Sequence, residues 1–191
     1  MMGSRMTSVG KRGGGLWRAA FWGGAASLLL IPAIAMRFTT EVNWDAADFI
    51  FAAVLIAGGG VGIESLVARS TNPAYRAASV LALLAVFLTI WVNAAVGMIG
   101  SEEGLYNLLF LGVIAVAVGG ALAARFRPDG MARAIAAAGV LHLMIAIGGL
   151  TADLRGALLS LAFAAPWLLS AALFRKANSE ESGSRDSAAR G

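Results

Sequence analysis

Six runs of about 20 largely apolar residues, separated by short charged or turn-forming segments, divide the chain. A helix needs about 20 such residues to cross the roughly 30 Å hydrocarbon core of a bilayer. Every backbone polar group inside lipid must also be satisfied within the segment, which favours helices. The sequence therefore predicts an all-α fold, a polytopic transmembrane helical bundle within residues 16–176. The predicted spans cover residues 17–36, 48–68, 75–99, 106–124, 131–150 and 156–174.

The composition agrees with a membrane location. Of the 191 residues, 59% are hydrophobic and only 14% are charged, whereas charged residues make up about 25% of a typical soluble protein. The chain contains no cysteine. Disulfides, thiolate metal sites, iron–sulfur clusters and a lipid anchor on cysteine are therefore excluded.

The first run also has features of a secretory signal peptide. It has a basic start, an apolar stretch and the small-residue triplet Ala33-Ile34-Ala35, which resembles a cleavage site. Cleavage after Ala35 would leave five spans. The apolar stretch from Ala19 onward is long for a signal peptide, so six spans are the prediction.

Lysine and arginine residues lie mostly on one side of the predicted spans. Short loops rich in these cations stay in the cytoplasm, and only Arg37 and Arg155 fall on the opposite side. Both termini are therefore predicted to be cytoplasmic. The cations on the predicted cytoplasmic side are Arg5, Lys11, Arg12, Arg18, Arg69, Arg76, Arg125, Arg127, Arg133, Arg175, Lys176, Arg185 and Arg190.

The net charge of +4 follows from this topology and does not indicate a nucleic-acid partner, because no polar domain is long enough to carry a nucleic-acid footprint. The lipid bilayer is the predicted partner, with other membrane proteins or a second copy as further candidates. Residues 1–15 and 177–191 are rich in Gly, Ser, Ala and charge. Such segments have little to bury, so both are predicted to be disordered cytoplasmic tails.

Glycine recurs at helical spacing inside the spans. Small residues about four positions apart let helices approach closely in lipid. The Gly58-Gly59-Gly60-Val61-Gly62 run lies inside an apolar span, so it does not indicate a phosphate-binding loop, which must follow a strand. The positions predicted to serve helix packing are Gly58, Gly62, Gly112, Gly119 and Gly139.

Polar side chains inside the spans are the candidate site. Such groups are costly in lipid and face the interior of the bundle, which makes them functional candidates. His142, the only histidine, and Asn93 lie in spans that run in the same direction, at similar predicted depth in the outer half. With Thr89 they are predicted to form one polar spot. An acidic vestibule above it would consist of Asp45, Asp48, Glu102 and Glu103.

The polar spot has two interpretations. It fixes helix packing through interhelical hydrogen bonds, or it binds a cation or proton, because histidine titrates near neutral pH and acids at the mouth concentrate cations. On the cytoplasmic side of His142, only Glu64 is available to line a route. Pairing with Arg69, Arg125 or Arg127 would explain Glu64 structurally.

No catalytic arrangement is recognisable, and we expect no enzyme activity, no metal site and no cofactor. A metalloprotease helix needs two histidines, and the Gly-x-Ser-x-Gly motif does not occur around Ser160 or Ser170. One histidine cannot supply bis-histidine haem ligation. A His–Met pair with Met98 or Met144 remains conceivable, but methionine in such spans is more often core filler.

Two stretches resemble a known group of proteins. Val42-Asn43-Trp44 through Asp48-Phe49 and the run from Trp91 to Glu102 are similar to VNW…DF and WxNxAVGxIGSE stretches of small uncharacterised bacterial multi-pass inner-membrane proteins. The similarity covers roughly residues 40–150. It implies a bacterial inner membrane and brings no activity.

The sequence therefore favours a non-enzymatic accessory or scaffold protein that assembles through small-residue helix faces. The alternative is a small cation- or proton-coupled transporter or channel that uses His142, Asn93 and Glu64.

Overall fold

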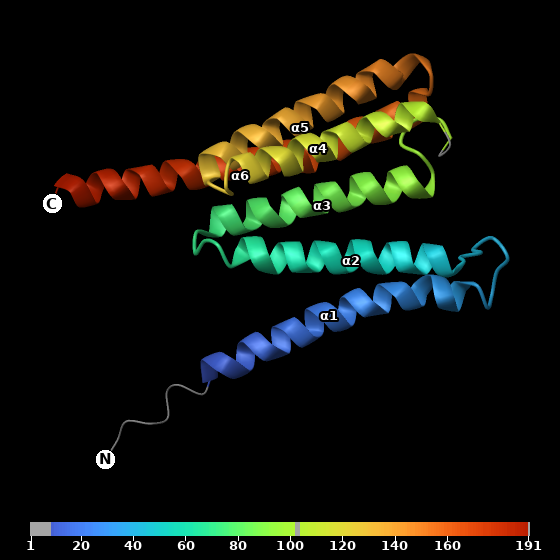
Figure 1. The fold of residues 1–191 in the computed structure, drawn as a ribbon, viewed down its shortest axis with the longest axis horizontal. Helices are drawn as coiled ribbons and strands as arrows, with labels where there is room; N and C mark the ends of the chain where they lie inside the picture. Colours follow the sequence, from blue (N-terminus) through green and yellow to red (C-terminus); the bar gives the residue numbers. More distant parts are fainter. Residues whose placement is uncertain (1–8, 102–103, 191) are drawn as a thin grey trace. The chain divides into compact units, whose positions relative to one another are not determined.

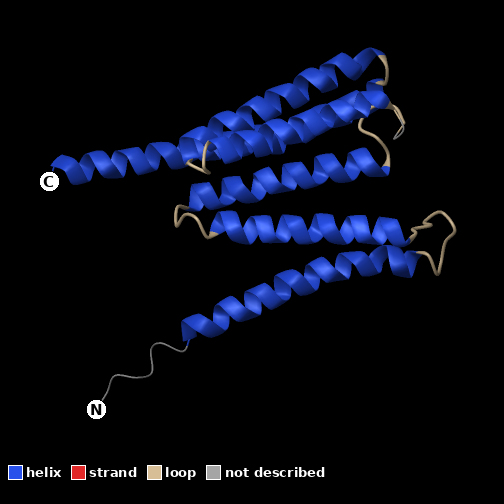
Figure 2. Ribbon diagram, viewed as in Figure 1, coloured by secondary structure: helices blue, strands red, loops and turns tan. Residues whose placement is uncertain are grey.

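The computed structural model describes residues 9–101 and 104–190, and for residues 9–17 only the backbone. The described part consists of helices and connecting turns without a strand (Figures 1 and 2), so the predicted all-α class is confirmed. Six helices are long and apolar enough to cross a membrane. They are α1 (Val9–Ala35), α2 (Ala46–Val67), α3 (Pro73–Ala95), α4 (Leu109–Ala123) with the 3₁₀ turn η1 (Leu105–Leu108) before it, α5 (Pro128–Gly148) followed by η2 (Gly149–Thr151), and α6 (Leu154–Arg190).

The chain forms two compact units, Met1–Val61 and Gly62–Gly191, hereafter unit 1 and unit 2. In unit 1, α1 and α2 approach closely at Gly60, where an added Cβ atom would lie 2.7 Å from the Trp22 ring. Asp45 and Asp48 begin α2: the Asp45 carboxylate accepts from the Ala47 and Asp48 amides, and the Asp48 carboxylate accepts from the Asp45 amide. This reciprocal pattern satisfies donors that a helix start leaves free.

Unit 2 is built around α6, which packs against both α3 and α5, while α4 packs against α5 (Figure 1). The core combines many alanines with a few large side chains, among them Trp167, Phe174 and Phe110. Large apolar side chains such as Leu111, at 51% exposure, cover the outside. An apolar exterior is expected for a surface that faces lipid.

Asn72 and Pro73 begin α3 as a cap followed by a first-turn proline. The Asn72 side chain accepts from the Ala74 and Tyr75 amides, at 2.8 and 3.2 Å. Proline does not destabilise the helix at this position, because a backbone N–H group in the first turn has no partner within the helix. The Asn72 side-chain amide also donates to the Glu180 carboxylate at 3.0 Å, which ties the turn before α3 to the far end of α6.

Two predicted boundaries are wrong. The third span was predicted to reach residue 99, but α3 ends at Ala95, because Gly97 adopts φ +74° and leaves the helical path. Residues 177–191 were predicted to be disordered, but α6 continues to Arg190. The ion pairs Lys176–Glu180 and Glu181–Arg185, each four residues apart, support this extension, and adding turns to an existing helix avoids the cost of nucleation.

The amino-terminal prediction is corrected in the same way. Residues 1–15 were predicted to be disordered, but α1 begins at Val9; residues 1–8 lie outside the described part.

At 37 residues, α6 is about 55 Å long at 1.5 Å per residue. This exceeds the roughly 30 Å of a bilayer core, so its charged C-terminal part projects beyond the predicted span.

Glycine contacts within unit 2 differ from the predicted set. An added Cβ atom at Gly62 would lie 3.1 Å from Leu83, and one at Gly139 would lie 3.0 Å from Leu168, so both positions serve helix packing. Gly112 and Gly119 pack against no other helix of unit 2, because an added Cβ atom there would meet nothing within 4 Å. In unit 1, Gly58 is likewise free of close contacts.

A close approach of α4 to α5 lies at a glycine that the spacing argument passed over. At Gly120 an added Cβ atom would lie 2.5 Å from the Ala134 Cβ atom. Spacing along one helix does not reveal which face meets a neighbour, so the sequence alone could not separate Gly120 from Gly119.

Candidate functional site

The segment 97–101, which follows α3, is held by the side chain of Asn107. The Asn107 Oδ1 atom accepts from the amides of Met98 and Ile99, both at 3.0 Å, and its Nδ2 atom donates to the Ser101 carbonyl at 2.7 Å. Asn107 itself is only 2% exposed. We call residues 97–101 the outer loop, after the side of the membrane that the sequence predicts for it. One buried amide thus satisfies three backbone groups that have left the helix.

Asp153 connects the outer loop to the start of α6. Its Oδ2 atom accepts from the Gly100 amide at 2.9 Å, and its Oδ1 atom accepts from the amides of Arg155 and Gly156. The bond from the Gly100 amide, and then that from Gly156, lower the pKa of the Asp153 carboxyl below its ordinary value. A charged side chain therefore fixes the loop and caps α6 at the same time.

Stability should fall in acid because of Asp153. Its folded-state pKa lies below the unfolded value of 3.8, so its contribution is complete above about pH 4 and is lost as pH falls through the folded pKa. We expect the unfolding temperature in detergent to drop below pH 4. Asp153→Asn should lower stability at pH 7 and flatten this drop, and an unchanged acid profile in the variant would contradict the assignment.

His142 reaches the outer loop through Ser160. The His142 Nε2 atom lies 3.1 Å from the Ser160 carbonyl, and the Ser160 hydroxyl donates to the Met98 carbonyl at 3.1 Å. Because a carbonyl only accepts, the Nε2 atom must carry a proton. The His142 ring is fully buried and meets Phe110 edge to face, with ring centroids 5.0 Å apart. His142 thus supports the segment of α6 that binds the loop.

Asn93 also acts on this end of unit 2. It lies in the last turn of α3 and donates from Nδ2 to the Asn107 carbonyl at 3.2 Å. The structure therefore links Asn93 to this loop through Asn107 and links His142 to it through Ser160. No direct bond joins the two side chains among the described residues.

Four buried polar atoms have no hydrogen-bond partner in the described part of the chain: Thr89 Oγ1, Asn93 Oδ1, His142 Nδ1 and Trp167 Nε1. Three of them belong to the residues of the predicted polar spot. Buried unpaired polar atoms are uncommon and costly, so these three mark the part of the candidate site that the loop contacts do not explain. Nothing in the structure explains the Trp167 indole.

The remaining predicted site residues lie elsewhere. Glu64 is half-buried three residues before the end of α2. Asp45 and Asp48 cap α2 in unit 1, and Glu102 and Glu103 lie outside the described residues, so the acidic vestibule stays a prediction. Within the described residues, 9–101 and 104–190, no three His, Asp or Glu side chains lie close enough together to hold a metal ion.

Asn107, Ser160 and Asp153 are the site residues that sequence reasoning missed. Asn107 was visible as an amide at the start of an apolar run, which is the same signal that identified Asn93. Ser160 gave no signal, because serine in a span commonly bonds to its own helix. Its bond to Met98 joins residues 62 positions apart in the chain.

The Trp91–Glu102 stretch, which carried the sequence resemblance, coincides with the end of α3 and the outer loop. Gly97 and Gly100 both adopt φ +74° there, a conformation that favours glycine. The glycines of this stretch are therefore explained by the loop geometry.

Comparison with protein-family models, curated proteins and solved structures finds no match for this chain. The resemblance to small bacterial inner-membrane proteins stays a prediction. Six apolar helices make the chain a multi-pass membrane protein, and any activity must be argued from its own residues.

Proposed function

We propose that this protein is a non-enzymatic accessory or scaffold protein that associates within the membrane through one face of α4. The supporting observation is that Gly112 and Gly119, seven residues or about two turns apart, share a face on which an added Cβ atom would meet nothing within 4 Å. Ala115, between them on this face, is exposed. A second copy of the chain is the partner that we propose.

Close packing in lipid supports this proposal. Helices associate there through dispersion contacts, and small residues let two backbones approach closely. The interior contacts of unit 2 do not use Gly112 or Gly119, whereas Gly120, on a neighbouring face, packs directly on Ala134 of α5. The α4 helix thus has one small-residue face for its own chain and another that is open.

The test is energy transfer between donor- and acceptor-labelled copies in liposomes, measured as the lipid-to-protein ratio increases. We expect Gly119→Leu to weaken self-association by about tenfold or more, because a large side chain separates the backbones. Gly59→Leu in α2 is the matched control, since an added Cβ atom there also meets nothing within 4 Å. Absence of transfer in the wild type, or an unchanged affinity in Gly119→Leu, would contradict the proposal.

A small cation- or proton-coupled transporter or channel is the second candidate. The unpartnered Thr89 Oγ1, Asn93 Oδ1 and His142 Nδ1 atoms favour it, because such acceptors attract cations or protons. The same liposomes test it by flux under an ion or proton gradient. Flux that His142→Ala and Asn93→Ala abolish at unchanged stability would support transport. No flux, with both variants less stable, would support the structural role.

We further propose the inner membrane of a bacterium, with both termini in the cytoplasm. The supporting argument is the accumulation of Lys and Arg at the ends of the spans that lie on the terminal side. A reporter fused after Gly191 that is active only outside the cytoplasm should stay inactive.

A further inference from the structure

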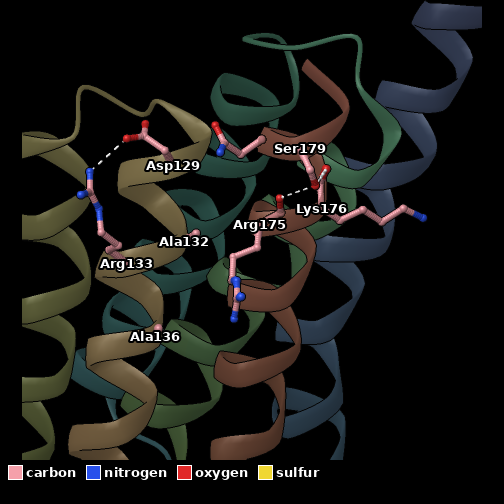
Figure 3. Close-up of a pocket in the computed structure, with 8 residues that line it drawn as sticks. Asp129, Ala132, Arg133, Ala136, Arg175, Lys176 and Ser179 are labelled. Carbon is pink, nitrogen blue, oxygen red and sulfur yellow. Dashed lines mark hydrogen bonds and ion pairs between the residues drawn. The ribbon is translucent and has the colours of Figure 1, made fainter. Parts of the chain in front are cut away.

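A groove lies between the first turns of α5 and the C-terminal part of α6 (Figure 3), at the end of unit 2 opposite the outer loop (Figure 1). The cavity measures about 700 Å³. We call it the basic groove, because Arg133, Arg175 and Lys176 line it against a single lining carboxylate, Asp129. A groove with this excess of positive charge suits an anionic ligand.

The carboxylates near the groove neutralise only part of this charge. Asp129 binds Arg133 at 3.0 Å, and Glu180 lies 3.9 Å from Lys176. In the described part of the chain, the Arg175 guanidinium has no carboxylate partner. Figure 3 shows its side chain extending away from Asp129, beside the part of α5 that carries Ala132 and Ala136. Arg175 is therefore the cation that is available to a ligand.

One wall of the groove is apolar and the rim is polar. Ala132 and Ala136 form the wall on α5, while Asn178 and Ser179 lie on the rim beyond Arg175. Arg175 directly follows Phe174, where the apolar run of α6 ends. Cations at such a position lie at the membrane surface. The groove therefore combines a phosphate-binding chemistry with a surface suited to an acyl chain.

We propose that the basic groove binds the phosphodiester headgroup of an anionic phospholipid, with Arg175 as the central contact. A guanidinium donates two parallel hydrogen bonds to phosphate oxygens, and Arg133, which also lines the groove, adds positive charge. The Lys176 side chain extends away from Arg175 (Figure 3). Basic pockets between membrane helices have the chemistry that recognises anionic headgroups. A soluble phosphate compound would use the same cations but not the alanine wall.

The experiment is native mass spectrometry of the full chain in detergent with added phosphatidylglycerol or phosphatidylcholine. We expect the wild type to retain phosphatidylglycerol in preference to phosphatidylcholine. Arg175→Gln should reduce phosphatidylglycerol retention by about fivefold, as expected for the loss of one cation at an anionic surface. Arg155→Gln removes an exposed cation at the other end of unit 2 and should retain the lipid as the wild type does.

Three results would overturn the proposal. These are equal retention of the two lipids by the wild type, equal loss in Arg175→Gln and Arg155→Gln, and displacement of phosphatidylglycerol by millimolar inorganic phosphate. The last would identify a soluble phosphate as the ligand. Because Arg175 is exposed and Gln keeps a long side chain, the variant is expected to fold, and an unfolding scan of each variant checks this. The result does not depend on self-association through α4.

Discussion

Replacing Asn107 with alanine should destabilise unit 2 by about 3 kcal/mol or more. The substitution removes one acceptor and one donor, and leaves the buried amides of Met98 and Ile99 and the Ser101 carbonyl without partners. Each buried polar group left unsatisfied costs about 1–3 kcal/mol. Because Met98 and Ile99 are only 3% and 4% exposed, water does not easily replace the lost bonds at their amides.

The measurement is the free energy of unfolding in detergent micelles, together with hydrogen exchange at the amides of Met98 and Ile99. Asn43→Ala is the control, since the Asn43 side chain makes no hydrogen bond to another described residue. We expect faster exchange at both loop amides in Asn107→Ala only. A change in unfolding free energy of less than about 0.5 kcal/mol would show that the outer loop does not depend on Asn107.

Replacing Gly97 with alanine should destabilise unit 2 by about 2–4 kcal/mol, for two separable reasons. Gly97 adopts φ +74°, which costs a residue with a Cβ atom about 1–2 kcal/mol. The Cβ atom would also lie 2.8 Å from Asn107 Nδ2 and from the Ser101 carbonyl group, which adds an overpacking cost of about 1–3 kcal/mol.

Replacing Gly100 with alanine separates the backbone cost from the overpacking cost. It has the same φ of +74°, but an added Cβ atom would meet nothing within 4 Å. Gly100→Ala should therefore cost only the backbone share, about 1–2 kcal/mol. Equal losses in Gly97→Ala and Gly100→Ala would show that the contact with Asn107 and Ser101 carries no cost.

Gly119 lies inside α4, where an added Cβ atom meets nothing within 4 Å. Gly119→Ala should therefore raise the free energy of unfolding by about 0.5–1 kcal/mol.

Some of the candidate site could be predicted from single residues. His142 and Asn93 were found because a polar side chain in an apolar run is expensive unless it has a partner. Their partners could not be found in this way. Ser160 and Asp153 reach the outer loop across 62 and 53 positions of the chain, and such distances close only when α3, α5 and α6 pack together.

The end of α3 shows why a boundary can be misjudged. Residues 96–99 are apolar apart from one glycine, so hydropathy extends the span through them. Met98 and Ile99 are indeed buried, at 3% and 4% exposure, but in a loop and not in a helix. Hydropathy measures burial, and it does not report whether a backbone amide bonds to its own helix or to the Asn107 side chain.

The sequence by itself determined that the chain has six apolar helices and where most of them lie. These properties are local, because a bilayer requires about 20 apolar residues for each span. Only the tertiary structure decided which glycines contact another helix, which polar side chains hold the outer loop, and that Arg175 faces a groove. Those properties depend on how helix faces pair, and the side chains that pair are distant in the chain.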